Sequence, residues 1–356
     1  FDGGQTGKNA QSARLSAEAR EQEHRSLRRE IRYSLNLAYA RVELAATKLA
    51  LTTDALRLAL DQSADIDLRS RVGTASQLDR IAAHKEMLNY RLLFYRSQNE
   101  LAAALRDLFA LTGETAQVDT ERPLPDTVVD RLPEGLEPPT LLTAFESLED
   151  TLQYFNAVRD ASASPGEDTP MVRSLDLYSR SALKAAEGQK GAAWPKRGLS
   201  AESRIAYPDL SKKDDYTNNI FSVNVSMPIW DARLNPSLSD KYLHEARAQE
   251  NQKAQLLSDL ARDHAKSSDA IASLGSQLGV SRAAGREAEE IARLTYLSYT
   301  AGRSTLLEVQ SANLKMMEAR VQTAGIQYEL ISRMAEMEYR SGSPENGKDK
   351  SHGSPE

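Results

Sequence analysis

The chain has 356 residues, of which 27% are charged and 6% are aromatic, and it contains no cysteine. This composition suits long helices better than a globular α/β core, and the net charge of −6 gives no electrostatic reason to expect a nucleic-acid partner. No apolar run reaches the length of a membrane-spanning helix. A chain without cysteine is compatible with an oxidising or a reducing compartment, so cysteine usage decides nothing.

The sequence contains two copies of one pattern. Residues 1–113 align without a gap with residues 230–342, and this alignment places Gly73 opposite Gly302 and Leu78 opposite Leu307. Few aligned positions are identical, so the prediction of a repeat depends on the coincidence of these landmarks. We expect two domains of the same fold.

The first repeat is predicted to be a helical hairpin. No proline or glycine interrupts residues 10–68, and apolar residues such as Val42, Ala45 and Leu49 recur at alternating steps of three and four. Residues 71–76 carry the turn signal that ends this helix. The return helix is expected to pack through a second heptad stripe: Leu78, Ile81, Lys85, Leu88, Leu92 and Tyr95.

A connecting region is expected at 114–170, because its first part is rich in proline and acidic residues. Within it, residues 140–157 have the pattern of a short amphipathic helix, with Leu148 and Leu152 on the apolar side. Residues 171–195 are predicted to form a further helix that leads into strands.

Residues 196–229 are predicted to form a β-hairpin. Apolar and polar side chains alternate from Leu199 onward and again up to Met227, which is the period of strands with one apolar face. A polar loop at 209–218 joins them, and Pro228 ends the second strand because it cannot donate to a ladder. Strands of about ten residues are long enough to cross a bilayer when tilted.

The second repeat, at 230–342, is expected to form another helical hairpin with its turn at 300–304. Its return helix is predicted to pack through apolar residues that include Leu307, Leu314, Met317 and Ile331. Residues 343–356 contain no apolar side chain and are predicted to form a disordered tail.

The pattern resembles the TolC-like family of outer-membrane efflux factors. The motifs that carry the resemblance are MPIWD at 227–231, FDGG at 1–4, VGTASQLD at 72–79 and AGRSTLLE at 301–308. They look like the strand-to-helix junctions and hairpin tips of that family. Each motif alone is weak, and their order and spacing make the match specific.

The resemblance implies a mainly α fold with a small β part. Three chains would form a homotrimer in which β-hairpins build a shared β-barrel in the outer membrane and antiparallel coiled helical hairpins build a periplasmic α-barrel tube. Residues 140–157 would form the equatorial helix. The family has further helices and a strand hairpin that should precede Phe1, so we expect the chain to be truncated there.

The resemblance also implies a gate and a docking site at the helix tips. Tyr299, Asp79 and Glu308 match the tyrosine and acids of the family's gate, whereas Ser304 and Ser311 stand where an arginine and a second acid are usual. The alternative is an ordinary helix-end aromatic and solvated acids. The candidate docking residues for a periplasmic adaptor are Val72, Gly73, Thr74, Ala301, Gly302 and Arg303.

The function that follows is passive transport. The chain would be the outer-membrane conduit of an efflux system whose energy comes from an inner-membrane pump joined through an adaptor. No catalytic motif, metal-ligand spacing or cofactor motif occurs in the sequence, so no enzyme activity or cofactor is expected. A soluble coiled-coil scaffold is the alternative, but it leaves the amphipathic strand pair unexplained.

Overall fold

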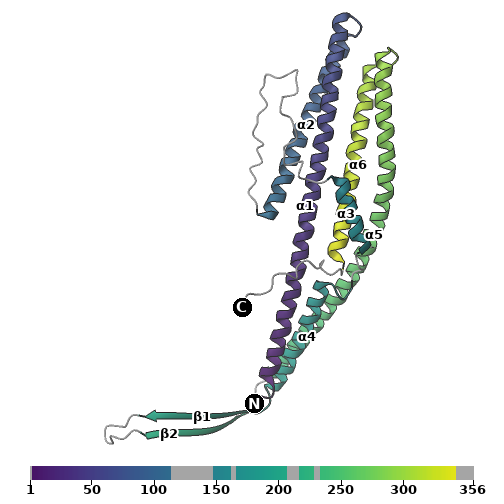
Figure 1. Cartoon of the computed structure of the whole chain (residues 1–356). Coiled ribbons are helices and arrows are strands. Elements are labelled where there is room, and N and C mark those ends of the chain that lie inside the picture. Colours follow the sequence, from purple (N-terminus) through teal and green to yellow (C-terminus); the bar gives the residue numbers. More distant parts are fainter. Residues whose placement is uncertain (1, 114–146, 162–165, 207–215, 228–232, 342–356) are drawn as a thin grey trace. The chain divides into compact units, whose positions relative to one another are not determined.

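The computed structural model describes residues 2–113, 147–161, 166–206, 216–227 and 233–341. The described part is mainly helical with one two-stranded sheet, which confirms the predicted fold class (Figure 1). The elements in chain order are α1 (Gln5–Val72), α2 (Gln77–Thr112), α3 (Leu148–Ala161), α4 (Pro170–Gly191), β1 (Lys196–Ala206), β2 (Tyr216–Ser226), α5 (Leu234–Thr300) and α6 (Leu306–Arg340).

The chain forms two compact units, each built from segments far apart in the sequence. The first unit contains Phe1–Arg28 and Ser164–Arg262, and the second contains Arg29–Ala163 and Asp263–Glu356. The start of α1, all of α4, both strands and the start of α5 therefore belong to the first unit. No helix in the described part of the chain has an 18-residue window apolar enough to cross a membrane.

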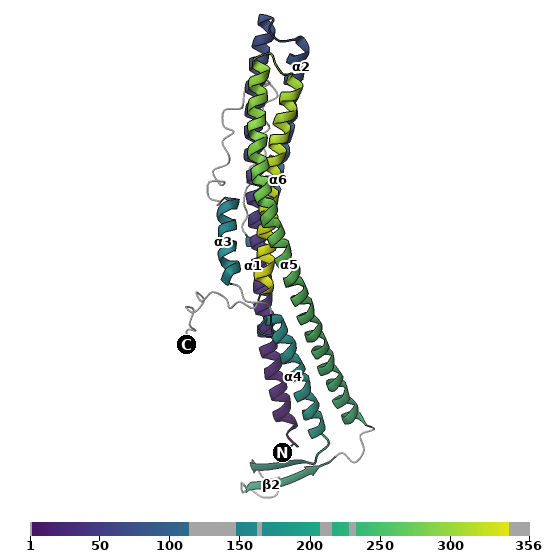
Figure 2. The same cartoon turned by 90° about the vertical axis from the view of Figure 1, so that its right-hand side faces the viewer.

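In the first unit, α4 lies between the beginnings of α1 and α5 (Figure 2). Small residues let α1 and α4 approach closely. At Gly188, an added Cβ atom would lie 2.5 Å from the Asn9 Oδ1 atom, so a larger residue would not fit without a shift. The Ser181 hydroxyl lies 3.0 Å from that of Ser12 and 2.8 Å from that of Ser16. These contacts hold α4, the helix that precedes β1, against α1.

The two strands are antiparallel, and their register separates an apolar face from a polar face. Leu199 pairs with Val223 and Ala201 with Phe221, and residues directly opposite each other in an antiparallel pair share one face. Leu199 is 86% exposed and Phe221 is 84% exposed. The predicted β-hairpin is therefore present, and its apolar side chains are uncovered in the single chain.

The opposite face of the strand pair is mostly polar, with Ser200 facing Ser222 and Gly198 facing Asn224. Ile220 interrupts it, because it pairs with Glu202. The strands begin earlier than predicted, at Lys196 and Tyr216, so part of the expected polar loop belongs to β2. The predicted strand end at Pro228 and the junction at 230–231 lie outside the described residues.

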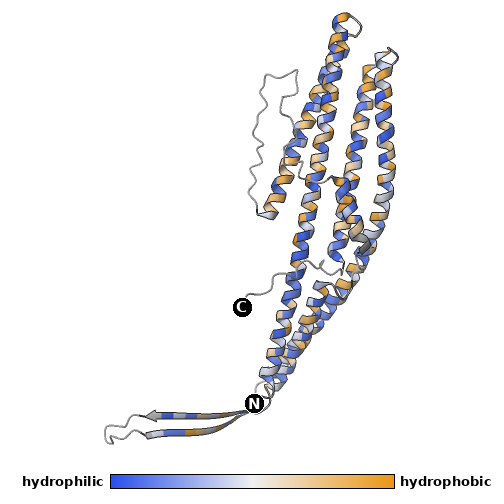
Figure 3. Cartoon of the chain, viewed as in Figure 1, coloured by the Kyte–Doolittle hydropathy of each residue, from blue (hydrophilic) through white to orange (hydrophobic). Residues whose placement is uncertain are grey.

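The second unit contains two helical hairpins, which we call the first hairpin (α1 with α2) and the second hairpin (α5 with α6) (Figure 1). Apolar residues recur along all four helices (Figure 3). The core of the first hairpin includes Val42, Leu49 and Leu56 of α1, which are seven residues apart. This spacing confirms the predicted heptad packing of α1.

The predicted packing stripe of α2 is wrong. Leu78, Ile81, Leu88 and Leu92 are exposed, and α2 packs instead through a neighbouring heptad stripe. Met87 is 2% exposed, whereas the adjacent Leu88 is 44% exposed. The residues of α2 that are buried are Ala83, Met87, Tyr90, Phe94, Ser97, Leu101, Ala102, Ala104, Leu105 and Leu108. Helix α2 therefore has two apolar stripes. The fold of a single chain buries one of them and leaves the other exposed.

The second hairpin shows the same behaviour. Met317 and Ile331 are buried as predicted, but Leu307 and Leu314 are 75% and 42% exposed. The return helix α6 therefore also keeps apolar side chains outside the core of the single chain.

Helix α3 lies against both hairpins of the second unit. Leu148 and Leu152 are buried in a cluster with Ile331 of α6, as the amphipathic pattern predicted. The Thr151 hydroxyl donates to Glu43 Oε1 of α1 at 2.7 Å, and Gln327 Nε2 of α6 donates to Glu149 Oε2 at 2.9 Å. The structure places α3 at Leu148–Ala161, and residues 140–146 of the predicted helix lie outside the described residues.

Tyr90 offers a test of how the first hairpin packs. Its ring is 3% exposed, its hydroxyl has no hydrogen-bond partner among the described residues, and burial raises its pKa to about 12. A buried hydroxyl without a partner is destabilising. We expect Tyr90→Phe to raise the free energy of unfolding by about 1 kcal/mol, measured by chemical denaturation. A loss of stability would show that the hydroxyl makes a hydrogen bond.

Candidate gate at the helix tips

The two hairpin tips are built alike. Gly73 and Gly302 have φ angles of 82° and 73°, in the left-handed region that glycine adopts without strain. The Thr74 amide donates to the Arg69 carbonyl at 2.8 Å, and the Arg303 amide donates to the Ser298 carbonyl at 2.8 Å. Each long helix therefore ends in a Schellman motif, as its turn sequence predicted.

The two candidate gate acids begin the return helices. The Asp79 carboxylate accepts from the Ser76 amide at 3.2 Å, and the Ser76 hydroxyl accepts from the Asp79 amide at 3.0 Å. Glu308 and Thr305 form the same reciprocal pair, at 2.9 Å and 3.3 Å. Both acids therefore complete capping boxes, and the S-x-x-D and T-x-x-E sequences are the signal for this role.

Tyr299 is half-buried near the tip. Burial raises the pKa of its hydroxyl, and the charge of Asp79 raises the pKa further. No hydrogen bond joins Tyr299 to Asp79 or Glu308 in the part of the chain that the structure describes. The hydrogen bonds that the structure shows for Asp79 and Glu308 are those of their own capping boxes.

A different tyrosine joins the two hairpins. The Tyr296 hydroxyl of α5 donates to Asp65 Oδ2 of α1 at 3.2 Å, and the same oxygen accepts from Arg69 Nε at 2.9 Å. Burial, and then the charge of Asp65, raise the pKa of Tyr296. The sequence alone does not predict this contact. The only feature that points to it is a second tyrosine, three residues before Tyr299.

Further contacts fasten α6 to the first hairpin close to the tips. Asn313 Nδ2 donates to Gln62 Oε1 at 3.0 Å, and both side chains are buried. Gln310 Nε2 donates to the Ala82 carbonyl at 3.1 Å. One apolar cluster joins α1, α2 and α6, and Tyr296 and Tyr299 of α5 pack against it; its buried members are Ile66, Ala83, Leu306 and Val309. The contact surface between the two hairpins, which we call the seam, therefore contains both hydrogen bonds and apolar packing.

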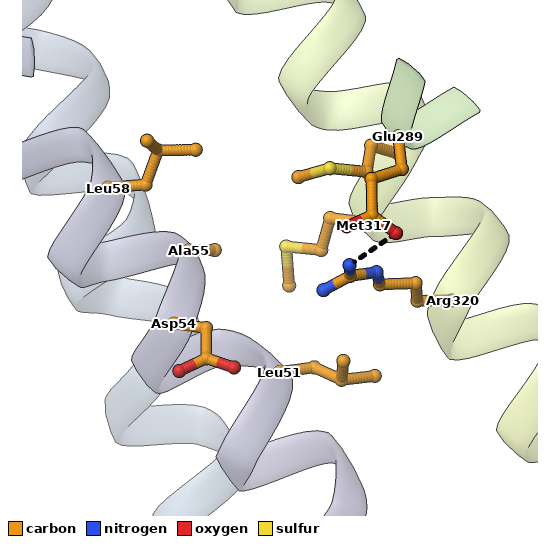
Figure 4. Close-up of a pocket in the computed structure, with 8 residues that line it drawn as sticks. Leu51, Asp54, Ala55, Leu58, Glu289, Met317 and Arg320 are labelled. Carbon is orange, nitrogen blue, oxygen red and sulfur yellow. Dashed lines mark ion pairs between the residues drawn. The ribbon is translucent and has the colours of Figure 1, made fainter. Parts of the chain in front are cut away.

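Farther from the tips, the seam is incompletely filled (Figure 4). A hollow of about 220 Å³ opens there, and Met317 of α6 faces Leu51, Ala55 and Leu58 of α1 across it. Arg320 forms an ion pair with Glu289 at 2.7 Å on the side of the second hairpin. We call this space the hollow; its full lining is Leu51, Asp54, Ala55, Leu58, Glu289, Met316, Met317 and Arg320.

The six candidate docking residues lie in the two turns. Val72 is 72% exposed, and Thr74, Ala301, Gly302 and Arg303 are also exposed. Among the described residues, no cluster of histidines or acids is arranged to hold a metal ion. The tips therefore present exposed turns, and hydrogen bonds join the two hairpins beside them.

Comparison with known proteins identifies the pattern. Residues 167–338 match the sequence profile of the family described as outer membrane efflux protein. No curated protein matches the sequence.

Solved structures match most of the chain. CusC, described as forming a transmembrane channel, is 17% identical with a TM-score of 0.73, and the match covers 94% of this chain and 73% of CusC. The VceC outer membrane protein of Vibrio cholerae is 14% identical with a TM-score of 0.72, covering 95% and 76%. The CmeC outer membrane channel of Campylobacter jejuni is 14% identical with a TM-score of 0.73, covering 97% and 70%. These likenesses show a shared fold.

The turn glycines give a test of the tip geometry. Alanine in the left-handed conformation is strained, so we expect Gly73→Ala and Gly302→Ala each to lower the free energy of unfolding by about 1 kcal/mol. Gly285→Ala is the matched control, because Gly285 lies within α5 with no atom near its added Cβ. That change should raise stability by about 1 kcal/mol. Thermal unfolding would measure the stability of all three variants. Equal changes in stability would contradict the left-handed conformation assigned to the two turn glycines.

Proposed function

We propose that this chain, whose residues 167–338 match the outer membrane efflux protein family, is the outer-membrane channel component of a tripartite efflux system. It works as a passive conduit through the outer membrane and the periplasm. The energy for transport comes from an inner-membrane pump, and a periplasmic adaptor joins the pump to the channel.

The strand pair is the observation that carries this proposal. Each strand has 11 residues, which is the length of a tilted strand that crosses a bilayer. Phe221, Val223 and Leu199 form an exposed apolar stripe, and the serines and asparagine between them occupy the other face. A lone pair of such strands leaves its edges open, and closure into a barrel with other copies removes them.

The exposed stripe of α2 supports assembly into a homotrimer. Leu78, Ile81, Leu88 and Leu92 keep heptad spacing on a face that the single chain does not cover. Such a stripe is typical of a helix that packs on a neighbouring helix. In the proposed trimer this neighbour is a helix of the next copy.

The tips are the proposed contact with the adaptor and the proposed gate. The exposed turns at Val72–Thr74 and Ala301–Arg303 are the docking surface, while Asp79, Tyr299 and Glu308 narrow the tube. Support for the gate comes from the charge of Asp79, which raises the pKa of the Tyr299 hydroxyl. The capping bonds of the two acids tie this gate to the starts of α2 and α6.

A soluble coiled-coil scaffold is the rival function. It accounts for the helical hairpins and the repeat equally well. It gives no reason for an amphipathic strand pair of bilayer length whose apolar face is uncovered. The channel accounts for both features, so we favour it.

A pair of substitutions on β2 tests membrane insertion. An acid at Phe221 would face lipid, whereas an acid at the adjacent Ser222 would face the barrel interior. We expect Phe221→Asp to reduce assembly of the full-length protein into outer membranes, since a charged side chain on the lipid face is destabilising. Ser222→Asp should assemble normally. Equal membrane fractions for both variants would rule out the proposed orientation.

A second pair on α2 tests trimerisation. Leu88→Asp changes the exposed stripe, and Met87→Asp changes the buried one next to it. We expect Leu88→Asp to keep its helical circular dichroism and to sediment as a monomer, while Met87→Asp loses helical structure. If Leu88→Asp sediments like the unaltered protein, the α2 stripe is not an interface between copies.

A further inference from the structure

We propose that the hollow is a binding site for a small organic cation, a primary ammonium ion that carries one aromatic ring. The ring lies among the apolar side chains of α1 and α6, and the ammonium group binds Asp54 at the rim. All the lining residues belong to the second unit of one chain. The inference goes beyond the proposed channel function and does not depend on it.

One wall of the hollow is a face of α1 with a gap in it. Leu51, Ala55 and Leu58 are spaced by four and then three residues, so they lie on one face of the helix. The alanine between the two leucines ends at its Cβ atom, which leaves space between this wall and Met317 of α6 (Figure 4). The hollow therefore follows from one small residue in a stripe of large apolar ones.

The opposite wall can adapt to a ligand. Met317 is 9% exposed, and Met316 also lines the hollow. A methionine side chain is unbranched and flexible, and its sulfur makes favourable contacts with aromatic rings. These properties favour an aromatic ring as the apolar part of the ligand.

The volume of the hollow sets the size of the ligand. An apolar cavity of about 150 Å³ in another protein holds one benzene molecule. The hollow has about 220 Å³, which leaves room beyond one ring for a short alkyl chain. A phenyl ring with a short aminoalkyl chain therefore matches the space.

The charged residues of the lining select a cation. The lining contains two acids and one arginine, and Arg320 is already paired with Glu289 at 2.7 Å. Asp54 lies on the α1 wall, and its ion pair with Arg57 has a separation of 4.0 Å, which is too long for a hydrogen bond. Its carboxylate can therefore accept a hydrogen bond from a ligand ammonium group, which also balances the excess negative charge.

The charged rim is open to water, whereas the apolar interior is not. The side chains of Asp54 and Glu289 are 65% and 56% exposed, in contrast to the buried Met317. An ammonium group at Asp54 keeps part of its hydration and so avoids the large cost of burying a charge. The ring gains free energy by leaving water. The hollow therefore suits a molecule with an apolar body and one charged end.

Methyl NMR of the full-length protein in detergent tests the site, with phenethylammonium as the probe. The chain contains 7 methionines, and carbon-13 labelling of their methyl groups gives a signal for each. We expect a saturable shift of the Met317 signal, because the ring current of a bound aromatic ring acts on nearby methyl groups. The variant Met317→Leu identifies this signal by its disappearance.

A pair of alanine substitutions tests the location. Ala55→Leu fills the hollow with a strong helix former, so it should abolish the titration and preserve α1. Ala50→Leu is the matched control, since it adds the same atoms at an exposed position of α1. It should bind the probe as the unaltered protein does. Unchanged signals from methionines outside the hollow show that the fold of each variant is intact.

The role of the charge is tested separately. We expect Asp54→Asn to weaken binding by up to about fivefold, which is the range for an exposed ion pair. Asp61→Asn changes an exposed acid of α1 outside the hollow and should leave binding unchanged. The neutral compound 2-phenylethanol has the same ring without the charge, so it should bind the unaltered protein more weakly than phenethylammonium.

Each outcome decides one part of the proposal. If Ala55→Leu titrates like the unaltered protein, or if every methionine signal shifts without saturation, the probe only partitions into detergent micelles and the site is overturned. If 2-phenylethanol and phenethylammonium bind equally well, the hollow does not select a cation and the proposed ligand class is wrong. None of these measurements involves transport, so the channel function is tested independently.

Discussion

A helix that pairs with one neighbour buries one face, and this constraint governs the structure. In the first hairpin, α1 and α2 pack through heptad stripes whose buried members include Val42, Leu49 and Met87. Helix α2 carries a second stripe with the same spacing, which remains exposed at Leu88 and Leu92. A chain with this pattern has more apolar helix surface than its own fold covers. Assembly with further copies is the simplest way to bury it.

The strand pair also has an apolar face that the single chain leaves exposed. Its register places Leu199 and Phe221 on one face and the serines on the other, and nothing in the described part of the first unit covers the apolar face. Close contacts at Gly188 and Ser181 hold α4, the helix that precedes β1, against α1. A two-stranded sheet has little stability alone. The proposed barrel in lipid would account for the length and the two-faced pattern of the strands.

Local patterns in the sequence predict the helix ends and the strand pair. They do not predict which apolar face of a helix is buried, because tertiary packing decides this. Gly73 and Gly302 end their helices as expected, because a left-handed residue after a long helix is a local requirement. The buried stripe of α2 was not predictable, since Leu88 and Met87 both belong to heptads and only tertiary packing decides between them. Similarly, two tyrosines precede the second tip, and only the fold brings Tyr296 rather than Tyr299 to an acid of α1.

The account depends on three copies closing into one hollow tube. The molar mass of the detergent-solubilised full-length protein, measured by light scattering with the detergent contribution subtracted, tests this most directly. We expect three times the mass of one chain, in a single species. A homogeneous monomer in mild detergent would contradict the account.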